Sequence, residues 1–333
     1  MCNHDTTGRA PPQDGDLNKF LSKSAACRSD IERAVLYGAD VMPAGRLESM
    51  ANCGMYLTFL HSRDFDKTKL ETGFFCKNRL CPACAWRKAA HDAVEINCIM
   101  QAATDAGYEL YFATLTAQSV KKTDLADAIR VYNAAYTAMM RNSTCTVIAG
   151  AIRKLEVTYN AEKDWYHPHI HSVWIVPRGW RRTKSYINRY TLADMWRYYL
   201  GGKYAVSADA QDVRRVKSAS REDVMEFAKY PAKSCDYLQS KDVFETFYKS
   251  LKGVRLITHM KLARALKAQY KHGLLDCYKQ PDTTQYFWRS MWKWARENAA
   301  YTLDQLEELS EPIIFGTTDT DETAGDNDAD PPY

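Results

Sequence analysis

The chain has 333 residues, of which 46% are hydrophobic, and it carries a formal net charge of +4. This length allows one large domain or two ordinary ones, and the apolar content is enough to build hydrophobic cores. The longest apolar runs fall well short of the roughly 20 residues needed to cross a bilayer, which excludes a membrane-spanning helix. The first residues are polar and lack an apolar signal segment, so we expect a cytoplasmic protein without a membrane partner.

The charges are segregated along the chain. Residues 301–333 contain ten acidic and no basic residues, so all 45 lysines and arginines precede them. Residues 1–300 therefore carry a strong excess of positive charge, which suits a polyanionic partner such as DNA. We expect residues 313–333 to form an acidic, disordered tail.

Apolar periodicity and turn residues predict the following elements in chain order. They are a helix at 30–37, a helix at 85–106, a strand at 108–117, a helix at 124–141, strands at 147–159 and 166–176, a helix at 191–200, a strand at 211–217, a helix from 221 and a helix at 261–270. The two strands on either side of a short polar turn are expected to pair as an antiparallel hairpin. Because strands and helices do not alternate regularly, the sequence predicts an α+β fold with a central antiparallel sheet and helices on one of its faces.

Four cysteines are spaced as a metal site. Cys76, Cys81 and Cys84 form a close group, and Cys53 on the preceding segment is the expected fourth ligand. In a reducing compartment such cysteines are more often thiols or metal ligands than disulfides. Four thiolates around one Zn²⁺ make a structural site, which predicts a zinc-stabilised N-terminal segment. The alternative is a group of free buried cysteines.

Alternating histidines suggest a second metal site. His167, His169 and His171 stand at the head of the apolar stretch 172–176, which is predicted to be a buried strand. Alternate residues of a strand share a face, so His169 and His171 can bind one cation. The third ligand is either Glu156, which lies across the predicted hairpin, or His167. The structural alternatives are packed or hydrogen-bonded histidines and a surface Glu156 paired with Lys154 or Arg153.

A tyrosine at a helix end is the candidate nucleophile. Glu226 and Tyr230 are four residues apart on the helix predicted from residue 221, so they share a face, and Pro231 ends that helix. A tyrosine is a weak nucleophile at neutral pH because its pKa is about 10, so the phosphate that it attacks must be activated. The alternatives are a Glu226 paired with Lys229 on a solvated helix and a nucleophile at Tyr237.

These motifs together resemble the HUH endonuclease superfamily, which nicks single-stranded DNA with a tyrosine. Residues 112–116 resemble the first family motif, the histidine run the second and residues 226–230 the third, in the family's order. The Cys-rich segment 76–86 is similar to the N-terminal part of plasmid rolling-circle replication initiators. The resemblance extends from about Cys53 to Lys233.

The resemblance implies a chemistry for each motif. Tyr230 would form a 5′-phosphotyrosine link and leave a free 3′-OH, while Glu226 would activate water for the terminating cleavage. Lys229 would assist catalysis and Lys233 would hold DNA phosphates.

The resemblance also implies cofactors and partners. Thr114 and Thr116 of the first motif would contact DNA, and the histidine site would hold Mg²⁺ or Mn²⁺. The expected partners are plasmid origin DNA, both double-stranded and single-stranded, together with a host helicase and a polymerase.

Changes in composition and the positions of turn residues suggest five regions. They are a flexible lead-in at 1–28, a zinc-binding segment at 29–100, the nicking domain at 101–240, a helical DNA-binding or accessory region at 241–312 and the acidic tail at 313–333. Within the fourth region the aromatic residues between Phe287 and Trp294 recur at helical spacing. The expected function is initiation and termination of plasmid rolling-circle replication. The alternatives are a transposase or mobilisation relaxase with the same chemistry and a non-catalytic zinc-dependent DNA-binding regulator.

Overall fold

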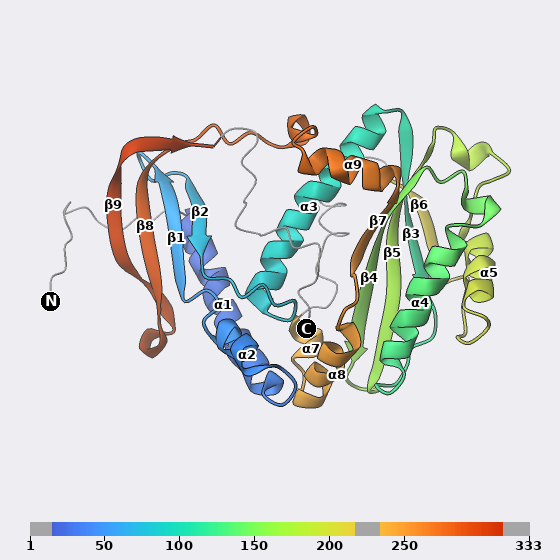
Figure 1. Cartoon of the computed structure of the whole chain (residues 1–333), viewed down its shortest axis with the longest axis horizontal. Coiled ribbons are helices and arrows are strands. Elements are labelled where there is room, and N and C mark those ends of the chain that lie inside the picture. Colours follow the sequence, from blue (N-terminus) through green and yellow to red (C-terminus); the bar gives the residue numbers. More distant parts are fainter. Residues whose placement is uncertain (1–14, 217–233, 316–333) are drawn as a thin grey trace. The chain divides into compact units, whose positions relative to one another are not determined.

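The computed structural model describes residues 15–216 and 234–315, which form two compact units (Figure 1). One unit contains residues 15–88 together with 280–315, and the other contains 89–216 together with 234–279. Each unit is built on one antiparallel sheet, which confirms the expected α+β class. Of the helices that the structure describes, none is long and apolar enough to cross a bilayer.

The larger unit contains a five-stranded sheet in the order β6-β3-β5-β4-β7. Its strands are β3 (Tyr108–Thr116), β4 (Gly150–Asn160), β5 (Trp165–Pro177), β6 (Asp212–Arg215) and β7 (Ile257–Lys261). β4 and β5 form the expected antiparallel hairpin, and its register places Glu156 directly opposite His169. β5 is the central strand, so its residues are flanked by β3 on one side and β4 on the other.

The expectation of helices on one face is wrong for this sheet, because β5 is apolar on both sides near its end and helices cover both faces. Val173 and Ile175 belong to a core with α3 (Pro82–Asp105) and α9 (Leu262–Lys271). On the other face Ser172 and Trp174 contact Tyr136 of α4 (Leu125–Met139). The remaining elements of this unit are α5 (Arg189–Tyr199), α7 (Ser234–Tyr237), α8 (Lys241–Leu251) and the 3-10 turns at Ser143–Cys145, Trp180–Arg182 and Asp276–Tyr278.

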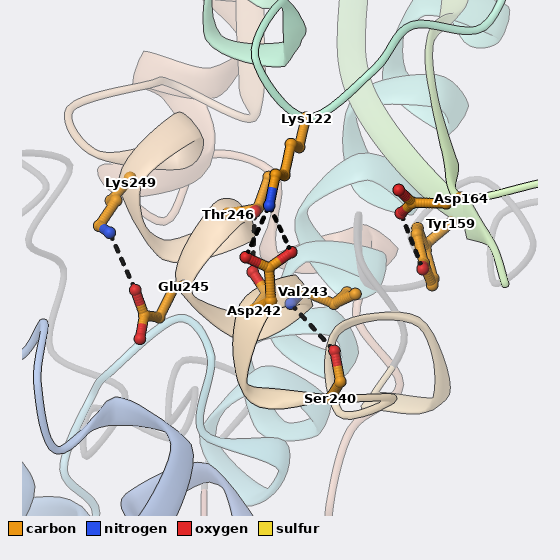
Figure 2. Close-up of polar contacts among 9 residues, drawn as sticks. All are labelled: Lys122, Tyr159, Asp164, Ser240, Asp242, Val243, Glu245, Thr246 and Lys249. Atoms are coloured by element: carbon orange, nitrogen blue, oxygen red, sulfur yellow. Dashed lines mark hydrogen bonds and ion pairs between the residues drawn. The ribbon is translucent and has the colours of Figure 1, made fainter.

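The start of α8 is fixed by two polar contacts (Figure 2). The Ser240 hydroxyl accepts a hydrogen bond from the Val243 amide and so caps the helix, which satisfies an amide at its first turn. Lys122, in the loop before α4, donates to the Asp242 carboxylate at 2.9 Å. The N-terminus of α8 is thereby tied to the loop that follows β3.

The smaller unit contains a four-stranded sheet in the order β2-β1-β8-β9. Its elements are α1 (Gly15–Gly38), α2 (Ala44–Ala51), β1 (Tyr56–Ser62), β2 (Thr68–Gly73), β8 (Gln285–Ala295), the 3-10 turn Arg296–Asn298 and β9 (Ala300–Ile314). Leu17 of α1 packs with Phe59 of β1 and Trp292 and Trp294 of β8. The C-terminal hairpin therefore completes a sheet that begins more than 200 residues earlier in the chain.

Three expectations are corrected by this fold. Residues 15–28, expected in a flexible lead-in, belong to α1. The region 241–312, expected to be helical, contains α8 and α9 but also β7, β8 and β9. The helix expected around Phe287 is wrong, because β8 buries every second residue, as a strand with one face against a core does. The residues expected in the acidic tail lie outside the described part from 316 onward.

Candidate active site

β5 carries the histidines in the middle of the larger sheet. His167, His169 and His171 alternate with apolar residues and share one face of the strand. The same face continues through Val173 and Ile175, which pack in the core with α3. One face of β5 is therefore polar in its first half and apolar in its second half.

Three side chains from two strands converge on this polar half. The Oε2 atom of Glu156 lies 3.3 Å from Nε2 of His171 and 3.7 Å from Nε2 of His169. Adjacent ligands of an ion bound at about 2.1 Å are about 3 Å apart, so these separations suit a shared cation. The side chains of Glu156 and His169 are each 13% exposed, and that of His171 is 32% exposed. The three groups thus face a half-open position on the sheet.

Hydrogen bonds orient both rings. Nδ1 of His169 lies 3.1 Å from the His167 carbonyl oxygen, to which it donates when protonated there. Nδ1 of His171 lies 3.3 Å from the Thr114 hydroxyl on β3. In each ring the partner at Nδ1 leaves Nε2 directed toward Glu156. Metal-binding histidines in proteins are held in this way by a hydrogen bond at the other nitrogen.

The electrostatics favour a neutral imidazole beside an ionised carboxylate. Burial, reinforced by the nearby His171, lowers the pKa of His169 to about 4, so its ring is neutral at pH 7. Burial would raise the pKa of Glu156, but the hydrogen bond from His171 and the charge of Lys154 outweigh it, and the pKa falls to about 2. A neutral imidazole and a carboxylate are the forms that bind metal ions.

His167 points to a different set of partners. Its Nε2 atom lies 2.8 Å from the Thr116 hydroxyl, and its Nδ1 atom lies 3.2 Å from the Ser119 hydroxyl. Both ring nitrogens are therefore engaged, and the group that is placed to hold a metal ion consists of Glu156, His169 and His171. Thr114 and Thr116, which we expected to contact DNA, lie against histidine rings.

The expected catalytic residues of the third motif lie outside the described residues. These are Glu226, Lys229, Tyr230 and Lys233. Tyr237, the alternative nucleophile, lies in α7 and is fully buried against Phe244 and Phe247. A buried phenol in an aromatic cluster is not accessible to a DNA strand.

The four cysteines lie together in the smaller unit. Sulfur–sulfur distances are 3.5 Å between Cys81 and Cys53, 3.6 Å between Cys53 and Cys84 and 3.7 Å between Cys76 and Cys84. Four sulfurs around one ion at about 2.3 Å are separated by about 3.8 Å in a tetrahedron, so the group fits a zinc site. The amide of Lys77 donates to the sulfur of Cys84 at 3.2 Å, and a hydrogen bond of this kind stabilises a thiolate.

The rest of the smaller unit holds this cluster in place. Arg28 of α1 donates to the Cys53 carbonyl at 2.6 Å, and Tyr301 of β9 donates to the Gly54 carbonyl at the same distance. The cysteine loop is thus attached to both ends of the described chain. The four-stranded sheet of the smaller unit was not expected from the sequence, whereas the four cysteine ligands were.

A comparison with known protein families decides the class of this chain. Residues 67–302 match the sequence model of a family described as replication protein. The chain belongs to this family. A Protein rep from Staphylococcus aureus is 34% identical over 200 residues, which cover 59% of this chain and 86% of that protein. A Protein rep from a Bacillus species is 30% identical over 221 residues, covering 61% and 71%. No solved structure matches the fold significantly.

The family match agrees with the resemblance drawn from the motifs, and supports a plasmid replication initiator. The expected alternative, a surface Glu156 paired with Lys154 or Arg153, is correct in its partner, because the Lys154 side chain lies 3.5 Å from Glu156. It is wrong about the surface, since the Lys154 side chain is 1% exposed and that of Glu156 is 13% exposed. Sequence reasoning overlooked Ser119, which lies in a loop where no periodicity marks it.

Proposed function

We propose that this protein nicks and rejoins one DNA strand with Tyr230 as the nucleophile, at the site marked by Glu156, His169 and His171. The convergence of these three groups on one face of the sheet is the observation that supports the proposal. Because this group is separate from the four cysteines, it favours an enzyme over a non-catalytic zinc-dependent DNA-binding regulator.

The donor set suggests which ion is used. Imidazole nitrogens suit divalent transition metals, whereas Mg²⁺ prefers an all-oxygen set; Mn²⁺ shares the preference for oxygen but, as a transition metal, also accepts nitrogen ligands. Two imidazoles and one carboxylate therefore favour Mn²⁺ over Mg²⁺ at this site. Glu156, His169 and His171 would hold such an ion, and its positive charge would stabilise the scissile phosphate during attack.

The cleavage step is an exchange of one phosphodiester for another. The phenol oxygen of Tyr230 bonds to phosphorus while the bond from phosphorus to the 3′ oxygen breaks, and the phenol proton passes through solvent to that 3′ oxygen. The products are a 5′-phosphotyrosine and a free 3′-OH that a polymerase can extend. Lys229 assists the departing oxygen and Lys233 holds a neighbouring phosphate. No nucleoside triphosphate is consumed.

Termination needs a second acceptor of the phosphoryl group. Glu226 takes a proton from water, which attacks the phosphotyrosine and releases the protein. The partners of this cycle are origin DNA, first double-stranded and then single-stranded, and a host helicase and polymerase. Zn²⁺ held by the four cysteines would have a structural role only, since four thiolate ligands leave no open coordination position on the ion.

The experiment is nicking of a supercoiled plasmid that carries the cognate origin. We expect the wild-type protein to produce an open circle with covalently attached protein in Mn²⁺, and His169→Ala and His171→Ala to lose both products while retaining origin binding. Glu226→Ala should keep the first nick and lose hydrolytic release. Full nicking by both histidine variants would contradict the proposal.

A further inference from the structure

A pocket of about 340 Å³ lies next to the histidine site in the larger unit. Its walls come from the loop between β3 and α4, from the first residue of β5 and from the segment after α5. Residues that line it include Ser119, Lys121, Asp124, Trp165, Lys203 and Tyr204. Its volume falls at the lower end of the range for pockets that hold small ligands.

Two features connect this pocket to the histidine site. Ser119 lines the pocket and its hydroxyl lies 3.2 Å from Nδ1 of His167. Trp165 is on β5 and shares the face of His167 and His169, because alternate residues of a strand point the same way. At 3.3 Å per residue, Trp165 is about 13 Å along the strand from His169. A DNA strand whose phosphate lies at the histidines therefore has neighbouring nucleotides within reach of the pocket.

The pocket contains an exposed aromatic ring and a cation, the kinds of group that bind single-stranded nucleic acid. The indole of Trp165 is 37% exposed, and the ammonium of Lys121 lies 4.9 Å from the centre of its ring. Stacking of a base on an exposed aromatic ring beside a cation is the usual means of holding single-stranded nucleic acid. Asp127 is paired with Lys203, so its charge does not repel a phosphate.

We propose that this pocket binds one nucleotide of the strand that is cut, with its base stacked on Trp165 and its phosphate near Lys121. The inference rests on the proposed nicking function and names a substrate subsite for it. The carboxylate of Asp124 accepts a hydrogen bond from an exocyclic amino group, which favours adenine, cytosine or guanine over thymine.

The pocket is held open by contacts of its own loop. The Gln118 amide donates to the Ala205 carbonyl at 2.9 Å, and Val120 exchanges backbone hydrogen bonds with Tyr166 of β5. The ammonium of Lys121 donates to the carbonyls of Lys163 and Asp164, at 3.1 and 3.3 Å. The next residue in the loop, Lys122, is tied to α8 (Figure 2). A preformed site loses less conformational freedom on binding, so stacking contributes more to affinity.

The test is fluorescence anisotropy of labelled oligo(dA) with the full-length protein in the absence of added divalent ions. Trp165→Ala should weaken binding about tenfold, Trp165→Phe should recover most of the loss, and Lys121→Met should lower the dependence of affinity on salt by about 0.7 in the logarithmic slope. Tyr198→Ala is the matched control, because Tyr198 is an aromatic side chain of the same unit and is 76% exposed. It should bind as the wild type does.

An abasic oligonucleotide separates stacking from folding. We expect the wild type and Trp165→Ala to bind it equally, because the abasic strand offers no base to stack on the indole. Binding of oligo(dA) by Trp165→Ala at wild-type strength, or the same loss toward the abasic strand, would overturn the subsite. If the wild type fails to nick its origin but the Trp165 effect persists, the proposed function falls and the subsite stands. If nicking is intact and the Trp165 effect is absent, only the subsite falls.

Discussion

The ammonium of Lys154 lies 3.5 Å from Oε2 of Glu156, and the lysine side chain is 1% exposed. A lysine this buried is uncommon unless it is paired. In the register of the sheet Lys154 also stands directly opposite His171. The candidate metal site therefore contains a positive charge of its own, which together with the hydrogen bond from His171 keeps Glu156 ionised before any cation binds.

This relationship predicts how stability depends on metal. Lys154→Met removes the positive charge nearest to Glu156, so the free energy of unfolding without divalent ions should fall by about 3 kcal/mol. Saturating Mn²⁺ should stabilise this variant more than the wild type, because the ion replaces the missing charge. Urea denaturation of both proteins with and without Mn²⁺ measures the difference. Equal stabilisation of the two proteins by Mn²⁺ would show that Lys154 does not act on this site.

Thr114 should act through His171 and not through DNA. Its hydroxyl lies 3.3 Å from Nδ1 of His171, so Thr114→Val should lower Mn²⁺ affinity about 10-fold to 100-fold, as loss of the hydrogen-bond partner of a ligand does. Thr114→Ser keeps the hydroxyl and should restore most of the affinity. Isothermal titration with Mn²⁺ gives both values. If Thr114→Val binds Mn²⁺ normally but binds single-stranded DNA weakly, the prediction is wrong and Thr114 contacts DNA.

The cysteine cluster predicts a linked loss of metal and stability. Cys81→Ser leaves an incomplete ligand set, so zinc content and thermal stability should fall together. Cys98→Ser is the matched control, since Cys98 is equally buried but lies in the core of the larger unit. It should lose stability and keep zinc. Elemental analysis and thermal unfolding test both, and a Cys81→Ser protein with a full complement of zinc would contradict the assignment.

A buried ionic group on α3 predicts a dependence of stability on pH. Oε1 of Glu95 lies 3.1 Å from Nε2 of His259, and its Oε2 lies 3.3 Å from Nζ of Lys267. Burial would raise the pKa of Glu95, but the hydrogen bond from His259 and the charge of Lys267 outweigh it and the pKa lies below its ordinary value of 4.5. A lowered pKa in the folded state stabilises the protein above about pH 4.5, and this stabilisation is lost as the pH falls through the folded-state pKa.

Glu95→Gln isolates that contribution. At neutral pH the variant should be less stable by about 1–3 kcal/mol, because a charged hydrogen-bonding partner is removed from a buried site. The difference between the two proteins should shrink as the pH falls from about 5 through the lowered folded-state pKa, as the wild-type carboxylate becomes protonated. Urea denaturation across this range provides the measurement. A difference that stays constant or grows on acidification would mean that Glu95 is not ionised in the fold.

The sequence was sufficient where the signals are local. The hairpin of β4 and β5 could be predicted because β5 ends in the apolar stretch 172–176 and the turn between the two strands is short and polar. The same pairing brought Glu156 opposite His169, so most of the candidate metal group followed from strand geometry alone. The four cysteine ligands followed from their spacing.

The sequence was insufficient where pairing is distant or where one residue masks a pattern. β1 and β8 pair although Phe59 and Ser290 are 231 positions apart, and no local signal reports such a contact. In β8 the buried row includes Tyr286, Trp288 and Trp292. Ser290 belongs to the same buried row but is polar, and its hydroxyl forms a hydrogen bond with His61. This polar residue in a buried row concealed the alternation and left a spacing that resembled a helix.

The proposed reaction requires Tyr230 to become covalently attached to DNA. The most direct measurement is to trap the wild-type protein on a labelled origin strand in Mn²⁺, digest it with protease and identify the peptide that carries the nucleotide by mass spectrometry. We predict that the label maps to Tyr230 and that Tyr230→Phe, which keeps the ring but removes the attacking oxygen, binds the strand and forms no adduct. An adduct on Tyr237 or on another residue, or an undiminished adduct in Tyr230→Phe, would contradict the account.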